Sequence, residues 1–172
     1  FGFGSMPVLD PAAMLQVVDD VAADLGVRAL VGAGWSAYDG AAAGRVFVAA
    51  AFDHDTWLPR CRAAVHHGGC GTTHAVLRAG LPAVVCSFLT DQPFWARQLV
   101  RLGVGAHVPF ARLSRARLTA ALLTVLDDAA AARARALAPV LRAEDGAAVA
   151  ASAIEAAVGV SPRGRATPLP PP

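Results

Sequence analysis

Short apolar runs alternate with longer amphipathic segments along most of the chain. Four runs are typical of buried strands, at residues 29–31, 45–48, 63–65 and 83–86. Between and after them, apolar side chains recur three and four positions apart, as on one face of a helix. Strands that alternate with helices predict a parallel sheet covered on both faces. We therefore expect an α/β domain with a Rossmann-like, doubly wound parallel sheet of about five or six strands.

Signals at helix ends help to locate the helices. Asp10 suits the N-cap of the first helix, Pro11 its first turn and Gly26 its stop, and Ser114 suits the N-cap of a later helix. The predicted helices cover residues 11–25, 57–62, 74–78, 94–102, 115–126, 129–142 and 146–158. Residues 1–5 are typical of a strand end that runs into a glycine turn, and residues 103–105 of a short strand or turn.

A glycine-rich turn lies near the middle of the chain. The apolar run that ends at Val65 is followed by His66-His67-Gly68-Gly69-Cys70-Gly71-Thr72-Thr73, and the next residues are helical up to Arg78. Glycines let a ligand approach the backbone closely, and a helix N-terminus presents free N–H groups and the positive end of its dipole. A strand, a glycine turn and a helix in this order predict an anion site, although glycine clusters also make ordinary turns.

A second polar segment follows the next predicted strand. Asp91-Gln92 come after the run at 83–86, so two strand ends deliver histidine, hydroxyl, amide and carboxylate groups to one edge of the sheet. Open α/β sheets bind ligands at that edge. The glycine turn lacks the Gly-x-Gly-x-x-Gly of dinucleotide-binding folds and the Gly-Lys-Ser/Thr of a P-loop. Both common phosphate fingerprints are thus excluded.

Five separated motifs closely resemble, in order and spacing, the donor-binding signature of nucleotide-sugar glycosyltransferases with the GT-B fold. The nearest resemblance is to bacterial antibiotic and sterol glucosyltransferases. The motifs are Phe3-Gly4-Ser5-Met6, Gly34-Trp35, residues 54–60, residues 66–73 with Arg78-Ala79-Gly80-Leu81-Pro82, and Asp91-Gln92-Pro93-Phe94. The resemblance covers roughly residues 1–157. It implies that this chain is the C-terminal, donor-binding half of such an enzyme, without the N-terminal acceptor domain.

The resemblance also implies roles for individual residues. The diphosphate is expected to contact Ser5, His67, Gly69, Gly71 and Thr72; the base and ribose Trp35, Phe52 and His54; and the sugar hydroxyls Asp91 and Gln92. His66 is expected to belong to the strand end. The catalytic base is expected in the N-terminal domain, so no catalytic residue is assigned here. Which side chain holds the ribose stays open, because Ala75 stands where plant relatives carry a glutamate for it.

Some of these residues have a second interpretation. Ser5 could be an ordinary turn residue, Trp35 could plug the edge of the core, and His54, flanked by aspartates, could lie in an exposed polar turn. The loop around His54 also departs from the family pattern. Many relatives carry a proline at the position of Asp53 and a tryptophan at that of Thr56. The resemblance therefore implies a base contact for this loop but does not assign it to particular side chains.

The function implied is that of a metal-independent, inverting glycosyltransferase. It would move a hexose from a UDP- or TDP-sugar to a hydroxyl of a small lipophilic acceptor, such as a natural product or a sterol-like molecule. A helix N-terminus and an imidazole can stabilise the charge that grows on the departing diphosphate without a metal or other cofactor. This chain alone is expected to bind donor without efficient transfer. A nucleotide-sugar epimerase and a binding-only or helper module of the same fold are the alternatives.

Two other kinds of site use the same residues. His66, His67, Cys70 and His74 are zinc-ligand types, and Cys70 and His74 are four residues apart. Adjacent histidines on a strand point to opposite faces, which argues against this metal site. Cys70 could instead be a nucleophile paired with a nearby histidine. Relatives carry alanine or serine at its position, which favours a packing role.

Composition and charge exclude further classes. A net charge of +2 over 172 residues is too small to indicate nucleic-acid binding, and no apolar run approaches the roughly 20 residues of a transmembrane helix. Contact with a membrane surface is expected only if the acceptor is a lipid. Three cysteines, an odd number, favour reduced thiols and a cytoplasmic location.

Length and tail composition set the expected domain limits. A chain of 172 residues has the length of a single domain, so we expect one donor-binding domain over residues 1–158. A disordered proline-rich tail is expected over residues 159–172. The chain opens on Phe1 without a methionine, which is typical of a fragment.

Overall fold

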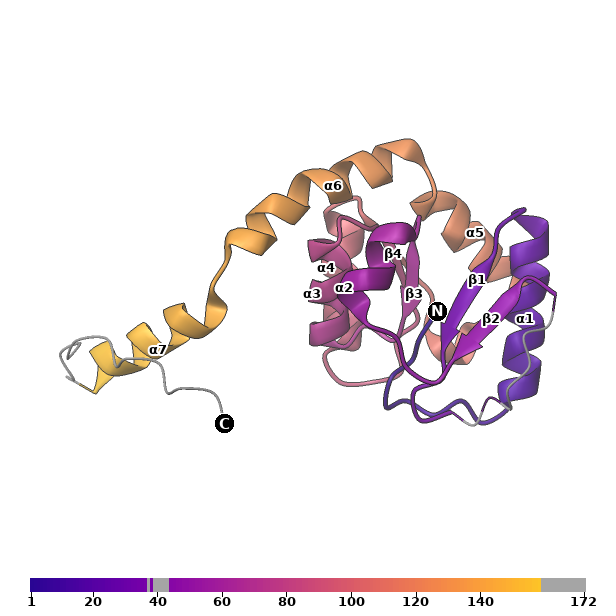
Figure 1. Ribbon diagram of the computed structural model, residues 1–172, viewed down its shortest axis with the longest axis horizontal. Coiled ribbons are helices and arrows are strands. Elements are labelled where there is room, and N and C mark those ends of the chain that lie inside the picture. Colours follow the sequence, from indigo (N-terminus) through magenta and orange to yellow (C-terminus); the bar gives the residue numbers. More distant parts are fainter. Residues whose placement is uncertain (37, 39–43, 159–172) are drawn as a thin grey trace. The chain divides into compact units, whose positions relative to one another are not determined.

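The computed structural model describes residues 1–36, 38 and 44–158. Contacts divide the chain into two units, Phe1–Leu141 and Arg142–Pro172. All strands of the described residues lie in the first unit (Figure 1). They are β1 (Ala29–Gly32), β2 (Val46–Ala49), β3 (Ala64–His66), β4 (Ala83–Val85) and β5 (Gly105–His107).

The first residues of the chain join two groups of strands into one parallel sheet. β1 pairs with β2, and β4 lies between β3 and β5. Gly2 bridges in parallel to Gly32 of β1 and to His66 of β3. The Gly2 N–H donates to the Val65 carbonyl at 3.0 Å, and the Gly32 N–H donates to the Phe1 carbonyl at 2.8 Å. The spatial order is therefore β2, β1, residues 1–4, β3, β4, β5, which confirms the predicted doubly wound parallel sheet.

Helices cover both faces of this sheet (Figure 1). They are α1 (Pro11–Asp24), α2 (His54–Trp57), α3 (Cys70–Arg78), α4 (Gln92–Arg101), α5 (Arg115–Val125) and α6 (Asp128–Ala143), with 3₁₀ turns at Leu58–Arg60 and Phe110–Arg112. α1 and α5 pack with Val65 and Val84 on one face. α3, α4 and α6 pack with Ala83 and Val85 on the other. Burial on both faces explains why β3 and β4 are apolar without alternation.

Side-chain caps account for most of the observed helix starts. Asp10 Oδ1 accepts the Ala13 N–H at 2.9 Å, and Ser114 Oγ accepts the Arg117 N–H at 3.4 Å, as predicted. The single helix predicted at 57–62 was wrong. Asp53 Oδ2 accepts the Thr56 N–H at 2.9 Å, so α2 begins at His54. A 3₁₀ turn follows α2 because Pro59 has no N–H to continue the α-helical pattern.

Three other boundaries differ from the prediction. α3 begins at Cys70 and α4 at Gln92, so both helices start within the polar segments that precede their apolar stripes. β5 lies two residues beyond the predicted 103–105. Its shift follows from Gly103, which has φ of +67° and ends the turn after α4. Sequence periodicity identifies the apolar face of a helix, but it does not show at which polar residue the helix begins.

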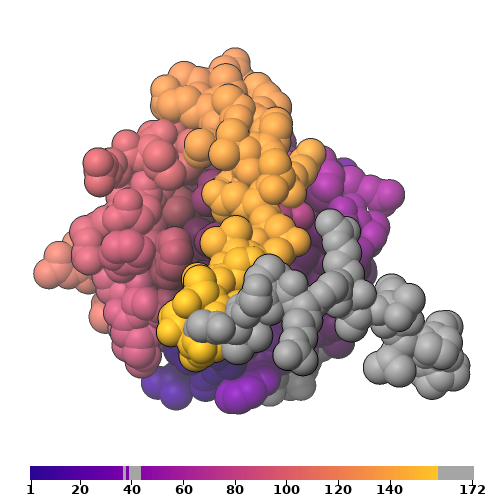
Figure 2. Space-filling model, turned by 90° about the vertical axis from the view of Figure 1, so that its left-hand side faces the viewer, coloured from indigo at the N-terminus to yellow at the C-terminus, as the bar shows by residue number. Residues whose placement is uncertain are grey.

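The helices after α5 differ in burial. Ala130, Ala134 and Ala138 of α6 are buried, and the Arg133 Nε donates to the Gly103 carbonyl at 2.8 Å. Figure 2 shows α6 (orange) lying on the surface of the first unit. In the second unit, α7 (Gly146–Ala157) is capped by Asp145 and has no buried residue. The tail predicted at 159–172 lies outside the described residues. None of the helices that the structure describes is long and apolar enough to cross a bilayer.

Candidate functional site

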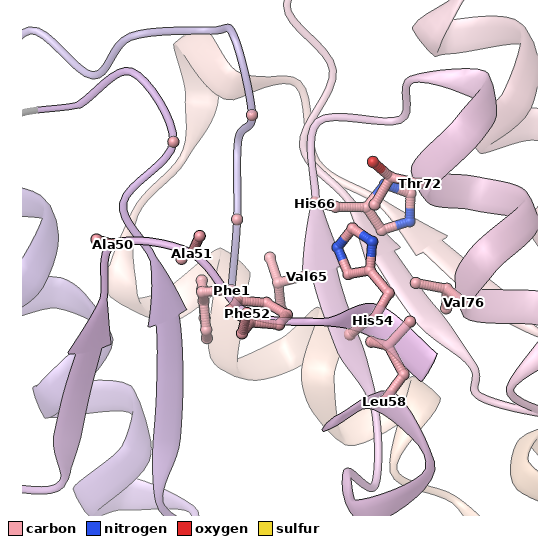
Figure 3. A pocket seen from close by; sticks show the side chains of 15 residues that line it. Phe1, Ala50, Ala51, Phe52, His54, Leu58, Val65, His66, Thr72 and Val76 are labelled. Atoms are coloured by element: carbon pink, nitrogen blue, oxygen red, sulfur yellow. The ribbon is translucent and has the colours of Figure 1, made fainter. Parts of the chain in front are cut away.

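A cavity of about 260 Å³ lies at the carboxyl ends of the strands (Figure 3). Its walls come from residues 1–4, the end of β1, the segment after β2, α2, β3 and the first turns of α3. Most of the lining is glycine or apolar side chain, including Phe52 and Val76. The polar side chains among the lining residues are His54, His66 and Thr72. The cavity therefore suits a largely apolar group with a few hydrogen-bonding atoms.

Glycines let neighbouring strand ends approach each other at this cavity. Gly34 has φ of +57°, and a Cβ there would clash with the Gly4 carbonyl oxygen. The Trp35 N–H donates to that same oxygen at 3.0 Å. A left-handed backbone this close to a carbonyl requires glycine. Gly4 and Gly34, both lining residues, thus fix the backbone beside the cavity.

Residues 66–72, which we call the glycine loop, run from the end of β3 into the first turn of α3 and line the cavity through His66 and Thr72. Gly69 is the N-cap of α3, and no described side chain caps this helix or places an acidic group in its first turn. A Cβ built at Gly71 would meet no atom within 4 Å, so open space lies in front of this turn. The free N–H groups and the helix dipole make this end of α3 an attractive position for an anion.

His67 lies against the backbone of this loop. A Cβ at Gly69 would clash with its ring, and one at Gly4 would lie 3.3 Å from its Cε1. Burial lowers the pKa of His67, while the Gly2 carbonyl and the Asp91 carboxylate oppose that shift. The ring is therefore mainly neutral near pH 7. An anion bound beside it would raise its pKa and favour the protonated form.

His66 has a different environment although it is the next residue in the chain. It is 2% exposed, and its Nδ1 accepts the Gly68 N–H at 3.0 Å. Burial, followed by the neighbouring His67, lowers the pKa of His66 to about 3. Figure 3 shows the rings of His66 and His54 pointing into the same space beside Thr72. The predicted position of His66 at the strand end is confirmed, because β3 ends there.

Asp91 and Gln92 lie next to the glycine loop, as expected for adjacent strand ends. A Cβ at Gly68 would lie 3.2 Å from the Gln92 carbonyl oxygen. The Asp91 Oδ2 accepts the Trp95 Nε1–H at 2.8 Å, and this hydrogen bond is the largest cause of the lowered pKa of Asp91. The buried Gln92 accepts the Phe88 N–H at 2.7 Å through its Oε1. The Asp91 Oδ1 also accepts the Thr90 hydroxyl at 3.1 Å. The exposed side of this carboxylate and the Gln92 N–H₂ group remain for a ligand.

Some of the other predicted contact residues line the cavity, and some do not. Phe52, His54 and Thr72 line it, and the Phe52 and His54 rings meet edge to face at 5.4 Å. His54 is also exposed, so its two interpretations are compatible. Trp35 is 76% exposed, which excludes the interpretation that it plugs the core edge. Ser5 lies in an exposed turn beside Gly4 and is not a lining residue.

Neither rival site gains support from the geometry. Among the described residues, no group of three or more His, Cys, Asp or Glu side chains could hold a metal ion. The His74 ring lies edge-on to the Trp95 ring, with 5.6 Å between their centroids. Cys70 is exposed at the first position of α3. In the described part of the chain its Sγ has no hydrogen bond to a histidine that would activate it.

The sequence interpretation missed the part that His66 plays in this cavity. Side chains along a strand alternate between the two faces of the sheet. His66 therefore lies on the same face as Ala64, which packs towards α3, and Val65 lies on the face that packs towards α5. This alternation could have predicted the position of the His66 side chain. The contributions of Phe1 and Gly32 had no local signal. They reach the cavity only because residues 1–4 join β1 to β3.

Known proteins match most of this chain. Residues 40–156 match the family model described as "Erythromycin biosynthesis protein CIII-like, C-terminal domain". A sterol 3-beta-glucosyltransferase of Arabidopsis thaliana is 36% identical over 156 residues, which are 88% of this chain and 25% of that protein. An "uncharacterized glycosyltransferase" of Mycobacterium leprae is 40% identical over 141 residues, which are 78% of this chain and 32% of that protein.

A solved structure agrees with these sequence matches. The glycosyltransferase SsfS6 of Streptomyces sp. SF2575, complexed with thymidine diphosphate, is 28% identical and superposes with a TM-score of 0.64. The match covers 82% of this chain and 36% of that one. The chain spans about a third or less of the length of the curated relatives it matches.

Proposed function

Because this chain belongs to the erythromycin biosynthesis protein CIII-like C-terminal domain family, which is of the GT-B glycosyltransferase type, we propose that it binds the nucleotide-sugar donor of a hexosyl transfer. The donor would lie along the carboxyl edge of the sheet. Its nucleoside enters the cavity, its diphosphate faces the glycine loop, and its sugar extends towards Asp91 and Gln92.

The observation that carries this proposal is the uncapped N-terminus of α3 beside the His67 ring. The N–H groups of its first turn have no described side-chain acceptor, and open space lies in front of Gly71. Gly69, Gly71 and Thr72 would donate to phosphate oxygens, and His67 would contribute a ring N–H and, once protonated, a positive charge. Ser5 would complete the diphosphate side from the turn after Gly4.

We propose a metal-independent, inverting reaction in which these residues act on the leaving group. The acceptor hydroxyl oxygen attacks the anomeric carbon from the face opposite the diphosphate, and the C–O bond to the β-phosphate breaks. Its electron pair stays on the phosphate oxygen, where the α3 N-terminus and His67 stabilise the new charge. The acceptor's proton passes to a base that we place outside this chain. The residues described here act on the leaving group.

The sugar and base contacts are proposed from the atoms still free to bond. The exposed Asp91 carboxylate and the Gln92 N–H₂ group would bind hexose hydroxyls, while the Trp95 and Phe88 contacts hold both side chains in place. Phe52 and His54 line the cavity that would receive the nucleoside. Trp35, exposed at the end of β1, would meet the base from outside.

The relatives narrow the range of donors and acceptors. One similar structure holds thymidine diphosphate, and one similar protein acts on a sterol. We propose a UDP- or TDP-hexose as donor and a hydroxyl of a small lipophilic molecule as acceptor. The acceptor would be bound by a domain beyond this sequence, because the chain spans only a third of its relatives. The isolated chain would then bind donor without efficient transfer. We also propose a cytoplasmic location for the protein.

Calorimetric titration with UDP and TDP tests the proposal. We expect His67→Ala to weaken diphosphate binding by roughly 30-fold, because a hydrogen bond to a charged group contributes about 1.5–3 kcal/mol. His74→Ala is the matched control, since this histidine lies on α3 with its ring against Trp95. It should leave the affinity within about twofold, as expected for a residue without a ligand contact. Equal losses in both variants, or no binding by the wild-type chain, would overturn the proposal.

A further inference from the structure

His66 carries its ring proton on Nε2. Its Nδ1 accepts the Gly68 N–H at 3.0 Å and therefore has no hydrogen of its own. Burial keeps the ring neutral, because its pKa is lowered to about 3. A neutral imidazole with an unprotonated Nδ1 must carry its hydrogen on the other nitrogen. The Gly68 hydrogen bond thus fixes both the tautomer and the orientation of the ring.

This N–H group is buried without an acceptor. The Nε2 atom is inaccessible to solvent and has no hydrogen-bond partner within the part of the chain that the structure describes. Buried polar groups in native proteins almost always have a partner, and leaving one unpaired is costly. The ring lines the cavity (Figure 3), so the missing acceptor can come from a molecule bound there.

The surroundings of Nε2 favour an uncharged acceptor. The cavity is otherwise lined mainly by glycine and apolar residues such as Phe52 and Val76. Transfer of an ionised oxygen into such a space would be costly, and the N-terminus of α3 already offers an exposed position for charge. A hydroxyl or carbonyl oxygen can accept from a neutral imidazole without that cost. The nucleoside part of a donor carries such oxygens, and Thr72 lines the same cavity (Figure 3).

We propose that His66 is a positioning residue whose Nε2–H donates to an uncharged oxygen of the nucleoside, with the ribose hydroxyls as its natural acceptors. This inference rests on the proposed function. It gives the ribose a protein partner, which the side chain of Ala75 cannot provide because it has no hydrogen-bonding group. The two adjacent histidines then divide the donor between them: His67 contacts the diphosphate and changes its charge, whereas His66 contacts the nucleoside and stays neutral.

Two substitutions test the roles of the two ring nitrogens of His66 separately. Asparagine places a polar atom near Nδ1 and can keep the Gly68 contact, but it has no group at the position of Nε2. Glutamine reaches the Nε2 position with an N–H₂ donor. We expect His66→Asn to weaken UDP or TDP binding by about tenfold, the usual effect of one lost hydrogen bond. His66→Gln should stay within about threefold of wild type. Inorganic pyrophosphate, which has no nucleoside, should bind all three proteins equally.

A spectroscopic measurement on the wild-type chain avoids any dependence on variant folding. In ¹⁵N-labelled protein, the His66 Nε2–H resonance should move downfield on addition of UDP or TDP and stay in place on addition of pyrophosphate. A structural role alone would not produce that difference. Nucleotide binding with an unmoved Nε2–H resonance would overturn this inference and leave the proposed function intact. Failure of UDP and TDP to bind at all would overturn both.

Discussion

The glycine loop and the 50–58 segment face one cavity but are built in different ways. The glycine loop is local: consecutive residues provide the turn, the start of α3 and the His66–Gly68 hydrogen bond. The 50–58 segment depends on distant parts of the chain. The Phe52 ring lies against Gly32 of β1, where a Cβ would come within 2.7 Å of its Cε1. Backbone groups dominate the first wall, and packed side chains dominate the second.

This difference suggests a division of work in donor binding. Free backbone N–H groups at a helix start recognise charge, and they tolerate side-chain variation as long as the backbone can be approached. A packed apolar wall recognises shape, so it depends on side-chain volume. Changes at the start of α3, the part of the glycine loop that faces the phosphates, should therefore alter binding of pyrophosphate and nucleotides alike. Changes in the 50–58 segment should alter binding of nucleotides only.

The largest effect is expected from His66, which belongs to the glycine loop and lines the cavity. Its pKa of about 3 in the folded protein lies below the ordinary histidine value, so the unfolded chain binds the extra proton. Its contribution to stability is fully present above about pH 6.5 and is lost as the pH falls towards 3. The slope reaches about 1.4 kcal/mol per pH unit. Between pH 6.5 and 4.5, wild type should lose roughly 2–3 kcal/mol more of its unfolding free energy than His66→Asn, as measured by urea unfolding. Parallel curves for the two proteins would show that the ring is not buried in its neutral form.

The next effect concerns the open space in front of α3. Gly71→Ala adds a methyl group that meets no protein atom within 4 Å, and it should slightly stabilise the helix. The same methyl group would occupy the position where we place a phosphate. Titration should show roughly 30-fold weaker binding of pyrophosphate and of UDP, as two hydrogen bonds to charge are weakened. Gly146→Ala, at the start of α7 and equally free of neighbours, is the control. Unchanged affinity in Gly71→Ala would mean that the anion does not approach this turn.

The cavity wall should show the opposite selectivity. Phe52→Ala removes an aromatic side chain that lines the cavity, and we expect about tenfold weaker UDP or TDP binding from the lost aromatic contact. Pyrophosphate should bind as to wild type. Phe94→Ala, an aromatic side chain that is 46% exposed on α4, provides the control. A parallel loss of pyrophosphate affinity in Phe52→Ala would contradict the separation of the two walls.

The smallest effect is expected from the cap that positions α2. Asp53→Ala removes the acceptor for the Thr56 N–H and should cost about 1 kcal/mol of unfolding free energy, as should Asp10→Ala at α1. Only the Asp53 variant should also weaken UDP binding, by about threefold, because His54 begins the helix that it caps. Chemical unfolding and titration measure the two quantities. Equal affinities in the two variants would show that α2 does not contribute to the nucleotide site.

The fold class and the position of the glycine loop could both be predicted from the amino-acid sequence. Strands and helix caps depend on residues close together in the chain. The apolar runs at β1 to β4 and the capping residues Asp10 and Ser114 could therefore be identified from the sequence. The same holds for the glycine loop, because a strand, a turn and a helix start are local structures. The helix at 57–62 failed because its start depends on one side-chain cap at Asp53 rather than on periodicity.

The apolar lining of the cavity, by contrast, depends on how distant segments meet in the fold. The cavity exists because residues 1–4 lie between β1 and β3, which brings Phe1, Gly32, Phe52 and Val76 to one place. No spacing along the chain reports that meeting, since it results from hydrogen bonds between segments about thirty or more residues apart. Burial likewise separated His66 from His67. Removal from water keeps the His66 ring neutral, whereas the His67 ring is only partly buried and lies near the Asp91 carboxylate, which favours its protonation.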